Sequence, residues 1–181
     1  MPRGENPILI VTGPPGVGKT TAAGILAARW DRAVHLEADA FFRFIRGGYV
    51  EPWRPESHPQ NQAVMRIVAG AAAGYTDAGY FTIVDGIVIP GWFFEPLREA
   101  LGDAGHAVAY AVLRAPLEVC LARGRSREGE MPVDAGAIEQ LWRSFADLGD
   151  LEENALDVGG MDAEEVSGQL AERLAGGLLA V

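Results

Sequence analysis

The amino-acid sequence predicts an α/β protein in which a parallel sheet is covered by helices on both faces. Short apolar runs that suit buried strands alternate along the chain with longer helical segments. The first of these runs leads into a glycine-rich loop, and the loop opens into an alanine-rich helical segment. The length of 181 residues and the hydrophobic share of 49% suit one globular domain of ordinary size. We therefore treat residues 1–181 as a single domain.

Five short apolar runs are the predicted strands. The first, residues 7–12, lies between Pro7 and Gly13, and its unbroken apolar character suits a strand that is buried on both faces. The third ends in Asp85, where the apolar run gives way to an acid and a glycine. In chain order the predicted strands cover residues 7–12, 33–36, 80–86, 106–113 and 154–158.

Helical segments are predicted between these strands. Asp39 opens a short one, whose aromatic spacing suits a helix with Asp39 at or near its N-cap. At the start of the last one, Asp162 and Glu165 have the spacing of a capping box. The predicted helices cover residues 19–30, 40–46, 60–79, 92–101, 115–123, 133–148 and 162–179.

The loop after the first strand has the pattern of a phosphate-binding loop, G-x-x-x-x-G-K-[ST]. Its glycines let successive backbone N–H groups point at phosphate oxygens, and the N-terminus of the next helix adds a positive dipole end. Lys19 would contact the β- and γ-phosphates of a nucleotide, and the Thr20 hydroxyl would bind Mg²⁺. The alternative is a tight strand-to-helix connection. The predicted nucleotide contacts are Gly13, Pro14, Pro15, Gly16, Val17, Gly18, Lys19, Thr20 and Thr21.

Lys19 is the only lysine in the chain, whereas arginine is used fourteen times among the 15 lysine and arginine residues. A compact ammonium suits the phosphate contact of this motif, where a planar guanidinium would fit differently. The position of the single lysine therefore favours the phosphate-binding interpretation.

Charge and composition limit the classes of partner. The formal net charge of −10 argues against a protein that tracks a nucleic-acid backbone, which needs a basic face, although local groups can still hold one nucleotide. Cys120 is the only cysteine, which suits a reducing compartment. No long apolar run suggests a membrane span or a leader. We expect a cytoplasmic monomer or homodimer without nucleic-acid or membrane partners.

Two acidic residues follow predicted strands, at the edge where open parallel sheets bind ligands. Asp39 follows the second strand and is a candidate base for the proton of an acceptor hydroxyl; a plain helix N-cap is the alternative. Asp85 ends the third strand and is a candidate to hold Mg²⁺ through water; a turn residue before Gly86 is the alternative. No Glu follows Asp85, which disfavours a hydrolytic motor.

Residues 47–59 form a predicted surface loop, because they contain Gly47, Gly48 and three prolines. A loop that is also rich in aromatic and arginine side chains is a candidate to contact the acceptor, and aromatic packing is the alternative. The candidate acceptor contacts are Asp39, Arg43, Arg46, Tyr49, Trp53, Arg54, Asp85 and Trp92.

A polar, glycine-flanked segment with several arginines lies between two predicted helices, as a mobile lid would; it covers about residues 124–131. Arg123 and Arg127 are four residues apart and share a face if the segment is helical. A solvated charged patch is the alternative, and phosphate contact is the interpretation that we favour for the cluster.

The three histidines are separated in the sequence and do not have the spacing of metal ligands. We therefore predict structural roles for all of them. They are His35, His58 and His106.

Four of these stretches together resemble the small P-loop kinases. They are the loop of residues 13–20, Asp39, the strand that ends in Asp85, and residues 113–123. The most similar layouts are those of chloramphenicol phosphotransferase, gluconate kinase, shikimate kinase and zeta-toxin-like kinases. Residues 42–49 are also similar to a broad bacterial group of AAA-type ATP-binding P-loop proteins. Residues 41–61 match none of the acceptor signatures of the named kinases, so the resemblance does not imply a particular acceptor.

The resemblance implies a nucleoside-kinase-like P-loop NTPase fold, which is a three-layer sandwich around a five-stranded parallel sheet of order 2-3-1-4-5. It implies ATP and Mg²⁺ as cofactors and transfer of the γ-phosphate to a hydroxyl of a small molecule. It also implies that Asp39 matches the catalytic aspartate, and that Arg123 and Arg127 match lid arginines.

The resulting hypothesis is an ATP-dependent kinase of a small hydroxylated metabolite or antibiotic. Its catalytic candidates are Lys19, Asp39, Arg123 and Arg127, and its metal candidates are Thr20 and Asp85. One rival is a toxin-like kinase of a nucleotide or nucleotide sugar, since nearby arginines would suit an anionic acceptor. Another is an ATP-dependent switch or binding protein without kinase activity. A GTPase with an N-K-x-D motif is disfavoured, because the only lysine is in the phosphate loop.

Overall fold

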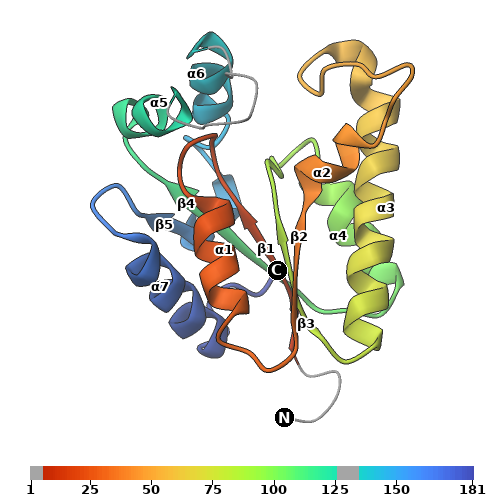
Figure 1. The fold of residues 1–181 in the computed structure, drawn as a ribbon, viewed down its shortest axis with the longest axis vertical. Helices are drawn as coiled ribbons and strands as arrows, with labels where there is room; N and C mark the ends of the chain where they lie inside the picture. The colour runs from red at the N-terminus through yellow and green to blue at the C-terminus, as the bar shows by residue number, and fades with distance from the viewer. Residues whose placement is uncertain (1–5, 126–134) are drawn as a thin grey trace.

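The strands in the described part of this protein form one parallel sheet. The structure is a computed structural model that describes residues 6–125 and 135–181 (Figure 1). The sheet has five strands in the order β2-β3-β1-β4-β5, and every strand pair in it is parallel. The predicted α/β class and the strand order implied by the resemblance are therefore confirmed. The strands are β1 (Ile8–Thr12), β2 (Ala33–Glu37), β3 (Phe81–Asp85), β4 (Val108–Arg114) and β5 (Ala155–Asp157).

Helices cover both faces of the sheet, which gives the predicted three layers. Figure 1 shows α1 and α7 on one side of the sheet and α3 and α4 on the other. The helices are α1 (Lys19–Ala27), α2 (Ala38–Arg43), α3 (His58–Asp77), α4 (Phe94–Asp103), α5 (Leu117–Arg125), α6 (Ala135–Arg143) and α7 (Ala163–Ala175). Two short 3₁₀ helices, η1 (Pro55–Ser57) and η2 (Gly149–Asn154), were not predicted.

The central strand β1 is buried on both faces, as its unbroken apolar sequence predicts. Side chains alternate between the faces of a strand. Ile8 and Ile10 therefore pack into the core beneath α3 and α4, and Leu9 and Val11 into the core beneath α1 and α7. All four side chains are fully buried. Two cores thus fix the strand that leads into the phosphate loop.

The helix that carries Asp39 begins earlier than its predicted start. Strand β2 ends at Glu37, and α2 starts at the next residue, so that Glu37 rather than Asp39 is at the N-cap. Asp39 is in the first turn of the helix. The helix ends at Arg43, so Arg46 lies beyond it, whereas the helix predicted over residues 40–46 includes Arg46. The difference arises because the strand runs into the helix without a connecting residue, and this buries Ala38.

The helix predicted over residues 133–148 is shorter in the structure, where α6 ends at Arg143. The chain then turns, which buries the Phe145 side chain in the core next to α4. The backbone carbonyl of Phe145 accepts a hydrogen bond of 2.8 Å from Nε of Arg114, which lies at the end of β4. The burial of Phe145 in the core and its hydrogen bond to Arg114 on β4 therefore end a helix that the local sequence favours.

The last helix has the predicted capping box but ends before the predicted position. The Asp162 side chain accepts from the Glu165 backbone N–H, and the Glu165 side chain accepts from the Asp162 backbone N–H. The helix ends at Ala175, and Gly177 adopts a φ of 69° that favours glycine. The chain then returns along β4, with an antiparallel bridge between Ala109 and Ala180. The prediction that the helix continues to residue 179 is therefore wrong.

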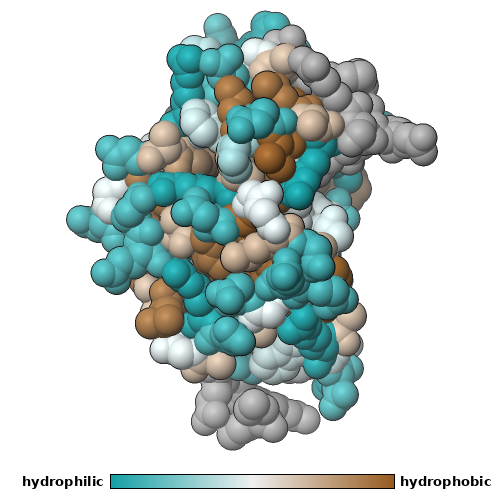
Figure 2. Space-filling model, turned by 90° about the vertical axis from the view of Figure 1, so that its left-hand side faces the viewer, coloured by the Kyte–Doolittle hydropathy of each residue, from teal (hydrophilic) through white to brown (hydrophobic). Residues whose placement is uncertain are grey.

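The outer face over α5 and α7 is mostly hydrophilic, with hydrophobic colour gathered mainly in its upper part (Figure 2).

In residues 6–125 and 135–181, no helix combines the length and the apolar character that a membrane crossing requires.

Candidate active site

The phosphate loop lies between β1 and α1, and its backbone conformation requires glycine. Gly13, Gly16 and Gly18 have φ angles of 141°, 80° and 105°, which side chains rarely allow. A Cβ on Gly13 would lie 2.2 Å from the carbonyl oxygen of Leu113, and one on Gly16 would lie 2.3 Å from that of Cys120. The loop therefore packs closely against the backbone at the end of β4 and against the backbone of α5.

This geometry predicts a large effect of Gly13→Ala on stability. The new Cβ meets a backbone oxygen, which has no freedom to move away as a flexible side chain would, and the φ angle is strained as well. We expect the free energy of unfolding in urea to fall by at least about 2 kcal/mol. The matched control is Gly70→Ala on α3, where nothing lies within 4 Å of the new Cβ. That exchange should stabilise the helix by up to about 1 kcal/mol. Equal stabilities of the two variants would contradict the loop geometry.

Lys19 places a buried positive charge in the loop. Its ammonium donates to the backbone carbonyl oxygens of Gly13 and Pro14, at 2.9 and 3.0 Å. The residue is only 5% exposed and is the first residue of α1. The N-terminus of a helix also attracts negative charge. The loop therefore combines an ammonium and a helix N-terminus at one place, which suits a phosphate group.

Thr20, Asp85 and His35 form a second cluster beside the loop. The Thr20 hydroxyl donates to Oδ1 of Asp85 at 3.3 Å, and Nε2 of His35 lies 2.5 Å from Oδ2 of the same carboxylate. The Asp85 side chain is 5% exposed and that of His35 is 17% exposed. The strand register pairs Asp85 with Val11 on one side and with Glu37 on the other, so the ends of three strands lie level here.

The residues present fit a magnesium ion that arrives with a nucleotide. Thr20 and Asp85 offer two hard oxygen ligands within hydrogen-bond distance of each other. Mg²⁺ commonly takes one or two protein oxygens and completes its shell with phosphate and water. Within the described part of the chain, no group of three or more His, Cys, Asp or Glu side chains could hold a metal by itself. The cluster suits a shared nucleotide–metal site rather than a permanent metal centre.

Asp39 and Tyr49 lie close enough to interact. Asp39 is exposed in the first turn of α2, at the carboxyl end of the sheet. Burial raises the pKa of Tyr49, and the negative charges of Glu51 and Asp39 raise this pKa further. The Asp39 carboxylate therefore lies near enough to Tyr49, in the loop after α2, to affect the titration of its hydroxyl.

The loop that carries the candidate acceptor contacts is braced by the start of α3. The Gln60 side chain bonds both backbone polar groups of Val50, accepting from its N–H at 2.9 Å and donating to its carbonyl at 2.7 Å. Asn61, which is 1% exposed, donates to the Pro52 carbonyl and to the Ser57 hydroxyl. The loop therefore has a defined conformation, which leaves the Tyr49 and Trp53 side chains 46% and 47% exposed.

The other predicted acceptor contacts are less well placed to contact an acceptor. Arg54 forms an ion pair of 2.9 Å with Glu51, and Arg43 lies 4.0 Å from Glu37. Arg46 is exposed beyond the end of α2. Trp92 stacks on Phe93 with ring centroids 4.7 Å apart and packs against the core beneath α3 and α4. Aromatic packing was the alternative interpretation of these residues. The structure shows such packing for much of the Trp92 side chain.

Arg123 lies beside the phosphate loop. Its Nη1 is 4.0 Å from the position that a Cβ on Gly18 would occupy. Burial raises the pKa of the Cys120 thiol, and the positive charges of Lys19 and Arg123 act in the opposite direction. Both cations are therefore near Cys120. Arg127 and residues 126–131 of the predicted lid lie outside the described residues.

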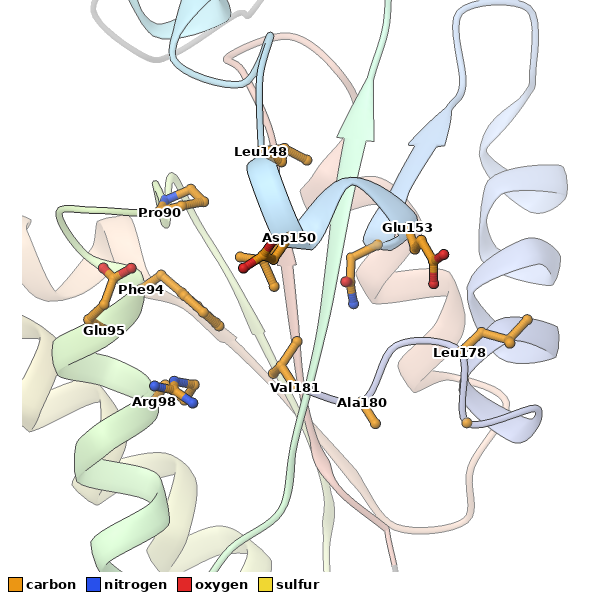
Figure 3. A pocket seen from close by; sticks show the side chains of 13 residues that line it. Pro90, Phe94, Glu95, Arg98, Leu148, Asp150, Glu153, Leu178, Ala180 and Val181 are labelled. Carbon is orange, nitrogen blue, oxygen red and sulfur yellow. The ribbon is translucent and has the colours of Figure 1, made fainter.

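A separate pocket of about 660 Å³ lies between α4, η2 and residues 177–181 (Figure 3). Figure 3 shows Glu95 and Arg98 extending from α4, with Asp150 and Glu153 from the η2 side. None of the predicted nucleotide, metal or acceptor residues lines this pocket. It is therefore not the site that the sequence motifs predict.

His35 is the site residue that sequence reasoning missed, because we predicted only a structural role for it. One signal was available in the alternation of strand residues. Ala33 and Ile83 pack into the core beneath α1, so His35 and Asp85, two residues further along β2 and β3, share that face. The pairing of His35 with Asp85 also depends on the strand register, which the sequence did not specify.

The sheet order, the glycine-rich loop around Lys19, and the Thr20–Asp85 pair define a protein with the P-loop kinase fold. A family model described as an AAA domain matches residues 8–148. The chain belongs to this AAA domain family. A comparison with curated proteins gave no match.

Several solved structures are similar over nearly the whole chain. The tunicamycin resistance protein of Deinococcus radiodurans is 25% identical, with a TM-score of 0.70, and the match covers 94% of this chain and 96% of that one. A sugar kinase from Janibacter sp. is 22% identical, with a TM-score of 0.70 and coverage of 96% and 98%. The APS kinase of Mycobacterium tuberculosis, in complex with AMPPNP and APS, is 18% identical, with a TM-score of 0.71 and coverage of 97% and 99%. The last two likenesses establish the fold alone.

Proposed function

We propose that this protein is an ATP-dependent phosphotransferase that moves the γ-phosphate of ATP to a hydroxyl group of a small molecule. The observation that carries the proposal is the cluster at the carboxyl end of the sheet, where buried Lys19 lies in the loop and Thr20 bonds Asp85. The likeness to a kinase structure that contains AMPPNP supports the choice of an adenine nucleotide.

Each residue of the site has a role in this reaction. ATP with Mg²⁺ supplies the transferable phosphoryl group and neutralises part of its charge. Lys19 binds the β- and γ-phosphates, while Thr20 and Asp85 hold the metal directly or through water. Arg123, which lies beside the loop, stabilises charge on the transferred group, and we assign the same role to Arg127. Asp39 accepts the proton of the acceptor hydroxyl.

The acceptor region favours an uncharged hydroxyl compound over an anionic one. Arg43 and Arg54 each have a glutamate close by, which offsets the positive charge that an anionic acceptor would need. Exposed ion pairs of this kind are weak, so a strongly charged acceptor could displace them. A nucleotide or nucleotide-sugar acceptor therefore remains the alternative outcome of the test.

Trp53→Ala is expected to raise the KM for the acceptor roughly fivefold, because an exposed ring on a braced loop can stack on a sugar or other ring. The KM for ATP should not change, because Trp53 belongs to the loop after α2 and not to the phosphate loop. The matched control is Tyr75→Ala, since Tyr75 is similarly exposed, at 43%, but lies near the opposite end of α3. An unchanged acceptor KM in Trp53→Ala would contradict the assignment of Trp53 to the acceptor site.

The experiment that tests the proposal is an ADP-release assay with ATP and Mg²⁺ against a panel of acceptors. Structures similar to this chain carry the names of a tunicamycin resistance protein and a sugar kinase. The panel therefore includes tunicamycin, sugars and polyols, together with nucleosides, nucleotide sugars and hydroxylated antibiotics. ADP release that depends on one of the neutral compounds supports the proposal. Release that depends only on nucleotides or nucleotide sugars would favour the toxin-like alternative.

We further propose that the protein acts in the cytoplasm, as a monomer or homodimer, with a small molecule as its acceptor. The net charge of −10 supports the absence of a nucleic-acid partner. Gel filtration coupled to light scattering measures the oligomeric state.

A further inference from the structure

We propose that His35 is a positioning residue that orients the Asp85 carboxylate toward Thr20 and the metal. This inference rests on the proposed nucleotide–metal site. It adds to that site a residue that is neither part of the P-loop pattern nor the acid at the end of β3. The side-chain partner of His35 is the Asp85 carboxylate, so its effect on the metal passes through Asp85.

The two oxygens of the Asp85 carboxylate have different partners. Oδ2 lies 2.5 Å from Nε2 of His35, and Oδ1 lies 3.3 Å from the Thr20 hydroxyl. Because a carboxylate accepts hydrogen bonds, Nε2 of His35 carries the proton and donates it to Oδ2. The histidine therefore fixes one oxygen and leaves the other directed at Thr20. In this orientation the two groups predicted to hold the metal lie within hydrogen-bond distance of each other.

His35 is itself held in place by its surroundings. It extends from β2 on the face covered by α1, and its Nδ1 lies 3.8 Å from the position that a Cβ on Gly24 would occupy. The imidazole is therefore confined between α1 and the end of β3. A side chain with so little room loses little rotamer freedom when it binds Asp85, which makes the contact effective for positioning.

Residues that orient metal ligands typically contribute about 10- to 100-fold to metal affinity. His35→Leu removes the donor and keeps an apolar side chain of moderate size. We therefore expect the Mn²⁺ concentration that half-saturates the complex with a non-hydrolysable ATP analogue to rise at least about tenfold. Affinity for the analogue in EDTA should stay unchanged, because the loop and Lys19 are intact.

The glutamine variant His35→Gln tests whether the hydrogen bond is responsible. The amide nitrogen of glutamine reaches about as far as Nε2 of histidine and also donates a hydrogen bond. We expect it to restore Mn²⁺ affinity close to that of the wild type. The matched control is His106→Leu, because His106 is also mostly buried, at 14% exposure, and lies 3.5 Å from a different carboxylate, that of Asp77. This control should not change Mn²⁺ affinity.

Electron paramagnetic resonance of free Mn²⁺ measures the affinities, and thermal unfolding checks that each variant folds. If His35→Leu does not fold, His35→Asn replaces it, because the shorter amide does not reach Asp85. The inference would be overturned if the variant that lacks the contact bound Mn²⁺ with wild-type affinity. It would also be overturned if His35→Gln failed to restore the Mn²⁺ affinity. If the wild type itself shows no Mn²⁺-dependent binding of the analogue, the proposed metal site fails instead.

Discussion

Replacing Asp39 with asparagine is expected to lower kcat by about 10²- to 10⁴-fold, the usual contribution of a general base. Asparagine has nearly the same size but cannot accept the proton of the acceptor hydroxyl. Asp39 is exposed in the first turn of α2, outside the loop that holds Lys19. The affinity for ATP should therefore remain close to that of the wild type. Steady-state kinetics and calorimetric titration with ATP measure the two quantities separately.

The matched control for this exchange is Glu37→Gln. Glu37 is a second exposed carboxylate, two residues earlier, and its side chain lies 4.0 Å from Arg43. Neutralising it changes the local charge by the same amount without removing the proposed base, so turnover should persist. Retained phosphate transfer in Asp39→Asn would contradict the assignment of the base. Equal losses in both variants would indicate a general charge effect.

Lys19→Ala is expected to weaken ATP binding about 10- to 100-fold, since a hydrogen bond from a charged donor to a phosphate contributes about 1.5–3 kcal/mol. The ammonium is buried and directed into the loop by the Gly13 and Pro14 carbonyls. Turnover should fall further than binding, because Lys19 also stabilises charge on the transferred γ-phosphate.

Lys19→Arg is the control that retains the positive charge. A planar guanidinium does not occupy the place of a compact ammonium, so we expect ATP affinity between that of the wild type and that of Lys19→Ala. Calorimetric titration with ATP gives the affinities, and thermal unfolding excludes a folding defect. Unchanged ATP affinity in Lys19→Ala would contradict the assignment of residues 13–20 as a phosphate-binding loop.

The parts of the site that the sequence could predict are those built from local pattern. The phosphate loop depends on glycines and one lysine at fixed spacing, and its position between a strand and a helix is readable from apolar runs. Asp85 was placed at a strand end for the same reason. The strand order was implied only by resemblance to known kinases, because neither composition nor periodicity specifies which strands become neighbours.

The parts that could not be predicted depend on contacts between distant residues. His35 meets Asp85 only through the register of β2 against β3. The bracing of Val50 by Gln60 requires the loop after α2 to fold back onto α3. Tertiary contacts of this kind also override local preference, as the burial of Phe145 does where α6 ends.

The measurement that tests the central claim most directly follows the γ-phosphate itself. ATP labelled in its γ-phosphate is incubated with the protein, Mg²⁺ and the acceptor that gives the strongest ADP release, and the products are separated and identified by mass. We predict that the label appears on a hydroxyl of the acceptor with the wild type, and that Asp39→Asn and Lys19→Ala lose this product. Label found only in inorganic phosphate, or retained in ATP that is bound but not turned over with any acceptor, would contradict the kinase assignment and favour a nucleotide-dependent switch.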